Sequence, residues 1–199
     1  MYIRFFEGLS VSEWKQKRSV IRRYDLTAHL YDLRYAEEQE AKYRIALESV
    51  RIARDSVVLD VGCGTGLLFS RVASKAGTVV GVDVSGEVLL RAREYAQDFQ
   101  SVHLVQADAD HLPFRNACFN AVFAFTVLQN MPKPWETLVE IRRTAKREAF
   151  IVVTGLKKAF SLEGFGALLR QAGLRAISLR DDGFLGCYVA VCRSSSWRY

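Results

Sequence analysis

Residues 57–68, Val-Val-Leu-Asp-Val-Gly-Cys-Gly-Thr-Gly-Leu-Leu, decide the fold of this chain. An apolar run typical of a buried strand ends at Asp60, three glycines follow at alternate positions, and an apolar stretch compatible with a helix comes next. Such a turn lets a ligand lie against bare backbone and helix-terminal N–H groups. The pattern predicts a ligand site, and the alternative is an ordinary strand-to-helix turn that is rich in glycine.

The spacing of the glycines separates two classes of ligand. Dinucleotide sites use G-x-G-x-x-G, whereas the glycines here run G-x-G-x-G from Gly62 to Gly66, and Leu67 occupies the position of the third dinucleotide glycine. The carboxylate of Asp60 would repel a pyrophosphate, and it would attract a ligand that carries an ammonium group and a sulfonium. S-adenosylmethionine carries both groups, so the sequence favours this cofactor.

Residues 60–66 resemble the first motif of the class I S-adenosylmethionine-dependent methyltransferases. Asp83 ends the next apolar run, where an acid can accept hydrogen bonds from both ribose hydroxyls, although it could instead cap the helix expected from Ser85. In the family, the first acid after the third strand accepts from the adenine amine and the next backbone N–H meets the ring. The resemblance implies these roles for Asp108 and Ala109.

The predicted cofactor site also includes the end of the fourth strand. There Phe125 and Thr126 would form the floor of the methionine pocket, or they could simply be core residues. No catalytic base stands out. The complete set of predicted cofactor-binding residues is Asp60, Gly62, Cys63, Gly64, Gly66, Asp83, Val84, Asp108, Ala109, Phe125 and Thr126.

Apolar runs alternate with helix-compatible stretches along the chain, which predicts a doubly wound α/β fold. We expect a mostly parallel sheet of about seven strands with helices on both faces, and an antiparallel edge hairpin around Asp181-Asp182-Gly183. The helix that starts at Pro134 should bury Trp135, Leu138 and Val139. The predicted strands span 57–61, 78–83, 102–106, 120–126, 148–153, 174–180 and 186–193, and the predicted helices span 37–53, 65–76, 85–97, 134–147 and 161–172.

Length and composition favour one domain over residues 1–199, with residues 1–35 as an N-terminal extension or lid and residues 36–199 as a Rossmann-like core. Half of the 199 residues are apolar, but no run approaches the roughly 20 residues that span a bilayer. No signal peptide is recognisable, and the four cysteines have no metal-binding spacing. We therefore expect a cytoplasmic protein with reduced thiols, no metal site and no membrane segment.

The net charge of +6 is unevenly placed, because residues 133–199 hold 12 basic and 6 acidic residues. Part of this excess resembles a solvated helix face, formed by Glu136, Glu140, Arg143 and Arg147. A second basic stretch contains Lys15, Lys17, Arg18, Arg22 and Arg23, with Trp14 and Tyr24 between them. Basic and aromatic residues together could follow a phosphate backbone, whereas the alternative is a charge excess that serves only solubility.

Residues 24–35 resemble the entry segment of the tRNA wobble-uridine carboxymethyl-ester methyltransferases and the rRNA guanine-N7 methyltransferases. Other segments, such as 112–114 and 127–129, are similar to the ubiquinone/menaquinone C-methyltransferases. The resemblance implies that Tyr24, Tyr31 and Arg34 line the substrate mouth, where Lys157 and Lys158 also follow the fifth strand. Tyr24, Tyr31 and Tyr35 could alternatively pack along one helix face.

These observations predict methyl transfer from S-adenosylmethionine to RNA, with tRNA or rRNA as the expected class, by in-line displacement. The alternatives are methylation of a small metabolite such as a quinone precursor, and a cofactor-binding subunit without catalytic activity. Both RNA-modifying groups work with a small zinc-binding activator protein that docks along the edge of the third strand. Val102, Leu104 and Val105 would present such an edge here.

Overall fold

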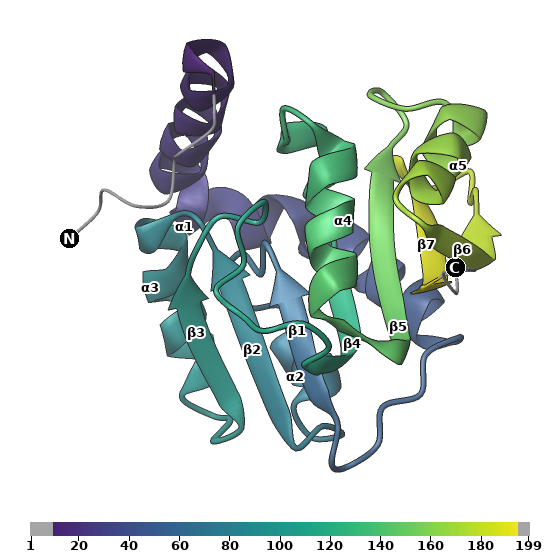
Figure 1. Cartoon of the computed structure of the whole chain (residues 1–199). Coiled ribbons are helices and arrows are strands. Elements are labelled where there is room, and N and C mark those ends of the chain that lie inside the picture. The colour runs from purple at the N-terminus through teal and green to yellow at the C-terminus, as the bar shows by residue number, and fades with distance from the viewer. Residues whose placement is uncertain (1–9, 195–199) are drawn as a thin grey trace.

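The computed structural model describes residues 10–194, apart from the side chains of residues 27–35. Its centre is one seven-stranded sheet of order β3-β2-β1-β4-β5-β7-β6 (Figure 1). Strand β7 runs antiparallel to both of its neighbours, and the other strands are parallel to one another. The strands are β1 (Val57–Val61), β2 (Thr78–Asp83), β3 (Val102–Gln106), β4 (Phe119–Ala124), β5 (Ala145–Leu156), β6 (Leu174–Arg180) and β7 (Cys187–Ser194).

Helices cover both faces of the sheet, as the alternating pattern predicted. On one face, α1 (Val11–Leu47), α2 (Phe69–Val72) and α3 (Gly86–Ala96) enclose a core that includes Phe69 and Phe123. On the other face, α4 (Pro134–Thr144) and α5 (Leu162–Gln171) pack over a second core that includes Ile141 and Phe165. A short 3-10 helix, η1 (Leu128–Asn130), follows β4. The doubly wound α/β fold with an antiparallel β6–β7 edge hairpin is confirmed.

Helix α1 differs most from the expectation. A helix was predicted over 37–53, but α1 begins at Val11 and ends at Leu47. Ser10 caps it, because the Ser10 hydroxyl accepts the Glu13 N–H while the Glu13 carboxylate accepts the Ser10 N–H. Its N-terminal half lies above the carboxyl ends of β2 and β3, and its C-terminal half runs behind the sheet (Figure 1). No change of secondary structure marks the proposed boundary between residues 35 and 36.

Two other helices are shorter than predicted. Helix α2 covers only Phe69–Val72 of the predicted 65–76, because the chain first closes two tight turns, from Cys63 to Gly66 and from Gly66 to Phe69. Helix α4 ends at Thr144 and not at residue 147, since β5 already begins at Ala145 and pairs there with β4. Arg147 therefore belongs to a strand and not to the predicted helix face.

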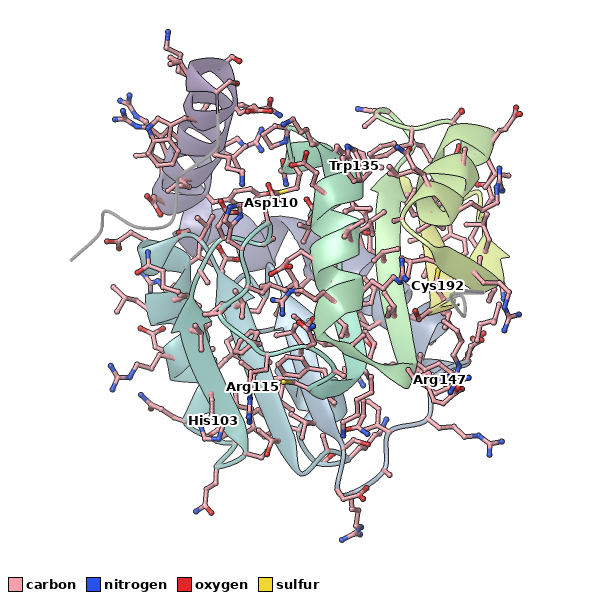
Figure 2. All side chains as sticks on the ribbon, in the orientation of Figure 1. His103, Asp110, Arg115, Trp135, Arg147 and Cys192 are labelled. Carbon is pink, nitrogen blue, oxygen red and sulfur yellow. The ribbon has the colours of Figure 1, made fainter. Side chains whose placement is uncertain are left out.

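The buried face of α4 also differs from the prediction. Leu138 is fully buried, but Trp135 and Val139 are 41% and 40% exposed, because the inward face consists of Thr137, Leu138, Ile141 and Thr144. Figure 2 shows Trp135 near the start of α4, at the end of the molecule that carries the carboxyl ends of the parallel strands. Within residues 10–194, no helix is long and apolar enough to cross a membrane.

Candidate functional site

The candidate site lies at the carboxyl ends of the parallel strands, beside the point where the strand order reverses between β1 and β4. Open α/β sheets bind ligands at this position. A cavity opens there beneath the N-terminal half of α1. It is lined by Lys17, Val20, Tyr24, Gly62, Gly64, Thr65, Val82, Asp83, Val84, Val88, Ala107, Asp108, Ala109, Phe125, Thr126, Val127, Asn130 and Met131.

The glycine turn supplies one wall of this cavity as bare backbone. Gly62 and Gly64 have φ values of +66° and +57°, a conformation that side chains with a Cβ rarely adopt. A Cβ on Gly62 would lie 2.6 Å from Val127 Cγ2, whereas a Cβ on Gly64 would meet nothing within 4 Å. The open space belongs to the cavity. Gly66 does not line it, and its role is to leave room for the ring of Phe69.

Asp60 and Cys63 lie in a second, smaller cavity behind the glycine turn, together with Gln39 and Tyr43 of α1. Phe125 borders both cavities, and its ring packs edge-on against Tyr43 at 4.8 Å. Burial, with a smaller contribution from the charge of Asp83, raises the pKa of Asp60 well above its usual range. No ion pair of Asp60 occurs among the side chains that the structure describes, so the Asp60 carboxyl group in this pocket has no described cationic partner.

Asp83 is held by the backbone at the end of β2. Its two carboxylate oxygens accept the N–H groups of Gly64 and Ser85, each at 3.0 Å. Burial raises the pKa of Asp83, and these hydrogen bonds act in the opposite direction. The alternative role as a helix cap belongs to Ser85, whose hydroxyl accepts the Val88 N–H. The Asp83 carboxylate thus lies in the cavity wall, with fixed orientation.

Asp108 is occupied differently, by a lysine. Lys17 Nζ lies 2.6 Å from Asp108 Oδ2 and 2.6 Å from Asp110 Oδ2. All three side chains are at most 6% exposed. Lys17 was predicted to belong to a phosphate-binding stretch, but it points into the protein and is already paired. Figure 2 shows Asp110 between α1 and α4, where it also accepts a hydrogen bond from Thr137.

Thr126 has an unusual backbone for a β-branched residue, with φ +63°. Its N–H donates to Thr154 Oγ1 at 2.7 Å, and its carbonyl accepts the side-chain amide N–H groups of Gln129 and Asn130. Its hydroxyl accepts from Gln39 and Lys42 of α1 at 3.4 and 3.3 Å. These contacts hold the residue at the cavity floor, and sites that hold strained backbone are commonly functional.

The mouth of the cavity contains only some of the residues predicted there. Tyr24 lines it, and its hydroxyl accepts a hydrogen bond from the Asn130 amide at 3.2 Å. Lys157 does not line it, because its ammonium pairs with Asp181 at 2.6 Å and donates to the Asp182 carbonyl in the β6–β7 turn. Lys158 is exposed and also lies outside the lining. The side chains of Tyr31 and Arg34 fall outside the described residues.

Sequence reasoning missed several residues of the site. Asn130 lines the cavity and also accepts a hydrogen bond from Arg23. Gln39 borders the smaller cavity from a helix that the motifs do not reach. For Lys17 a signal existed: it lies three residues from Trp14, four from Ile21 and seven from Tyr24, on the inward stripe of α1.

The described residues fit S-adenosylmethionine. The bare wall at Gly64 leaves room for a ligand, and the buried acids Asp60 and Asp83 match a ligand that brings positive charge and hydroxyl donors. A pyrophosphate would instead add negative charge to two carboxylates whose pKa values are already raised.

Comparison with known proteins agrees with this chemistry. Residues 59–153 match the protein family described as "Methyltransferase domain". The sequence is 28% identical over 152 residues to a malonyl-[acyl-carrier protein] O-methyltransferase of Marinomonas sp., covering 74% of this chain and 55% of that protein. The chain spans about half the length of the curated relatives it matches.

Solved structures show the same fold at low sequence identity. A putative methyltransferase complex with the Trm112 methyltransferase activator of Haloferax volcanii matches with TM-score 0.78 and 18% identity, covering 88% of this chain and 97% of that one. A complex described as DhpI–SAH matches with TM-score 0.74 and 20% identity, covering 95% and 100%. Fold, motif and family match together define a class I S-adenosylmethionine-dependent methyltransferase domain.

Proposed function

We propose that this chain catalyses methyl transfer from S-adenosylmethionine, with the cofactor held in the two cavities that share Gly62, Gly64, Thr65 and Phe125 in their walls. The observation that carries the proposal is the arrangement of three acids around the bare glycine turn: Asp83 and Asp108 line the principal cavity, and Asp60 lines the smaller cavity behind the turn. In this arrangement Asp83 accepts from the ribose hydroxyls, Asp108 accepts from the adenine amine, and Asp60 faces the ammonium end. Phe125 and Thr126 form the floor beside the reacting group.

The chain's own contribution to the reaction is alignment and exclusion of water. When bound, the cofactor supplies a methyl group that its sulfonium has already activated. Tyr24 and Asn130 narrow the mouth through which the acceptor approaches, and the N-terminal half of α1 covers the cavity from the solvent side. The described lining of the principal cavity contains no His or Glu, and its two acids, Asp83 and Asp108, are already held by hydrogen bonds within the protein. An acceptor that carries no removable proton therefore suits the site best.

Replacing Asp83 tests the placement of the cofactor. Asp83→Asn should weaken binding of S-adenosylhomocysteine by roughly 10- to 100-fold, because a charge-assisted hydrogen bond to the ribose is lost. Isothermal titration calorimetry measures the affinity, and far-UV circular dichroism checks that the variant is folded. Unchanged affinity in a folded Asp83→Asn protein would contradict the proposed site.

We propose RNA as the acceptor, on the evidence of the outward face of α1. Lys15, Arg18 and Arg22 are exposed there at helical spacing, above the cavity, and Arg18 also lies over the Trp14 ring at 5.9 Å. Cations next to an aromatic ring are a surface that suits a phosphate backbone.

The RNA proposal is tested by salt dependence. Changing Lys15, Arg18 and Arg22 together to Gln should reduce the slope of log affinity against log salt for single-stranded RNA by about 2, since each phosphate contact contributes about 0.7. A matched control changes three exposed cations near the opposite ends of the strands, namely Arg51, Arg54 and Lys75. Equal slopes for the two triple variants would contradict RNA binding by α1.

A small metabolite is the second candidate, favoured by the name of another relative, the demethylmenaquinone methyltransferase of Staphylococcus saprophyticus, which is 30% identical over 119 residues. Labelled S-adenosylmethionine with total cellular RNA, and separately with a metabolite extract, distinguishes the two. Label found only in small molecules would eliminate the RNA proposal. Label in neither fraction, despite measurable cofactor binding, would favour a subunit that binds the cofactor without catalysing methyl transfer.

We also propose that a small activator protein docks along β3. Support comes from the edge position of β3 and from a groove between it and α3 that contains Leu89, Leu90, Val102 and Leu104. Val105 does not contribute, because it packs on the opposite core. A structural neighbour was solved as a complex with such an activator. The proposal requires that a Leu104→Lys variant lose co-purification with the activator while its cofactor affinity stays unchanged.

A further inference from the structure

The adenine end of the site contains a cation that motif reasoning does not assign. Among the described residues that line the principal cavity, Lys17 is the one lysine or arginine. It comes from α1, whereas its partners Asp108 and Asp110 follow β3. The contact therefore joins parts of the chain 91 and 93 residues apart.

The geometry of the bridge fixes the Asp108 carboxylate. One oxygen, Oδ2, accepts from Lys17 at 2.6 Å, and the other, Oδ1, accepts the Asp110 N–H at 3.1 Å. A carboxylate oxygen can accept two hydrogen bonds, so each oxygen of Asp108 can accept one more, from a ligand in the cavity. Without Lys17, two buried carboxylates would face each other with no described cation between them, and their mutual repulsion would turn Asp108 away from its present orientation.

The loop that carries Asp108 and Asp110 has anchors of its own. Thr137 of α4 donates to Asp110, and the Glu140 carboxylate accepts the Leu112 N–H at 2.8 Å. Arg143 donates to the carbonyls of Leu112 and Phe114. Removing Lys17 should therefore leave the loop in place and change mainly the orientation and charge of Asp108.

The N-terminal half of α1 is also tied to the loops beside Lys17. Asp25 accepts a hydrogen bond from Ser85 after β2, and Tyr24 contacts Asn130 after β4. Glu13 pairs with Lys133 at 2.8 Å. The helix thus reaches the loops after β2, β3 and β4. Among these contacts, the Lys17 bridge is the one that involves Asp108, the acid that would recognise adenine.

We propose that Lys17 is a positioning residue that gives the site its preference for adenine. It holds the Asp108 carboxylate in the orientation that accepts from an amine donor, and it makes this recognition depend on the docked helix. The inference rests on the cofactor placement proposed above. Its distinguishing consequence is selectivity: loss of Lys17 should harm recognition of the adenine amine more than recognition of the ribose, which Asp83 serves.

The experiment compares two ligands that differ only in the base. S-adenosylhomocysteine carries the amine, and S-inosylhomocysteine carries an acceptor oxygen in its place. Lys17→Met should weaken binding of S-adenosylhomocysteine by about tenfold and binding of S-inosylhomocysteine much less. The ratio of the two affinities should therefore fall about tenfold. Asp83→Asn should weaken both ligands equally. Lys75→Met, which removes an exposed lysine near the opposite ends of the strands, should change neither.

The outcomes separate the two proposals. Equal loss for both ligands in Lys17→Met, unchanged affinity, or tighter binding would each overturn the role of Lys17. If Asp83→Asn changes neither affinity, the cofactor placement itself fails. Should Lys17→Met not fold, the double variant Lys17→Met with Asp110→Asn removes one of the two facing charges, and the same fall in the affinity ratio is expected of it.

Discussion

The two ends of the proposed cofactor site handle buried acid in opposite ways. At the end formed by β1, Asp60 is buried without a described ion pair, and its pKa is raised by burial. At the end formed by β3, Asp108 and Asp110 share the ammonium of Lys17. The sequence presents these acids as equivalent strand-end carboxylates, but their electrostatic surroundings differ.

The difference indicates which kind of ligand group each end binds favourably. A pocket with uncompensated acid gains from a ligand that brings a positive charge. A pocket that already contains its own cation needs no charge from the ligand and is suited to a neutral hydrogen-bond donor, such as an aromatic amine. S-adenosylmethionine has a positively charged end and a neutral end, which matches this division.

The largest expected effect is on stability at the β3 end. Lys17→Met should lower the free energy of unfolding of the ligand-free protein by about 3–5 kcal/mol, because removing one member of a buried ion pair leaves charge without a partner. Asp60→Asn should leave it unchanged or raise it, since a buried acid with a desolvation penalty is removed. Urea unfolding followed by circular dichroism measures both.

Lys75→Met is the matched control for this comparison, because an exposed lysine should contribute within about 0.5 kcal/mol. If Asp60→Asn destabilises the ligand-free protein as much as Lys17→Met does, the two ends are electrostatically alike and the comparison is wrong.

The next effect is on the pH dependence of stability. Burial raises the pKa values of Asp60 and Asp83 above the usual 3.8. At a pH between the unfolded-state and folded-state pKa values, the folded protein holds more protons than the unfolded chain. The contribution of these acids to stability is therefore fully present below about pH 3.8 and is lost as the pH rises through the folded-state pKa values. One such group contributes a slope of up to about 1.4 kcal/mol per pH unit.

Unfolding measured across this pH range should therefore show a shallower decline in Asp60→Asn than in the wild type. Binding of the positively charged cofactor should favour the ionised acid and release protons, whereas Asp60→Asn should release fewer. Calorimetry in buffers of different ionisation enthalpy counts the protons. An identical pH slope in the two proteins would show that Asp60 does not carry the raised pKa.

The smallest effect concerns the two glycines of the wall. Gly64→Ala should cost about 1–2 kcal/mol of stability through its positive φ, yet weaken the cofactor more than that, because the new methyl group enters open cavity space. Gly62→Ala should destabilise the protein more, since its Cβ would clash with Val127. Thermal melts with and without S-adenosylhomocysteine separate the two. A larger ligand-dependent shift in Gly64→Ala than in wild type would contradict the site.

The sheet and its helices could be predicted because each strand is a short apolar run bounded by a turn or a helix signal. The hairpin around Asp181 followed from turn chemistry. Strand alternation accounts for Cys187 and Cys192, which lie five residues apart on β7 and face opposite cores. The boundaries of the strands and helices were less predictable. Strand β4 ends at Ala124, two residues before the positive φ of Thr126, and β5 begins directly where α4 stops; local propensity signals neither boundary.

The motifs identified cavity-lining residues that follow one another in the sequence, and they missed those that a distant helix supplies. The glycine turn and its neighbouring acids form one contiguous pattern for each strand end. Lys17 and Gln39 reach the cavities from α1. Helical spacing groups Lys17 with Trp14 and Tyr24, but the docking of the helix decides which cavity this stripe meets. Lys157 is the opposite kind of error. Its position after the carboxyl end of β5 suggested a role in ligand binding, but its ammonium pairs with Asp181 of the β6–β7 turn.

The five hydrogen bonds around Thr126 divide the pocket floor into a part that must be kept and a part that is open to redesign. Val20 and Met131 line the same cavity with apolar side chains that offer no strong hydrogen-bonding group. A library that aims to admit bulkier acceptors would therefore diversify those two positions and leave the threonine, with its network, unaltered.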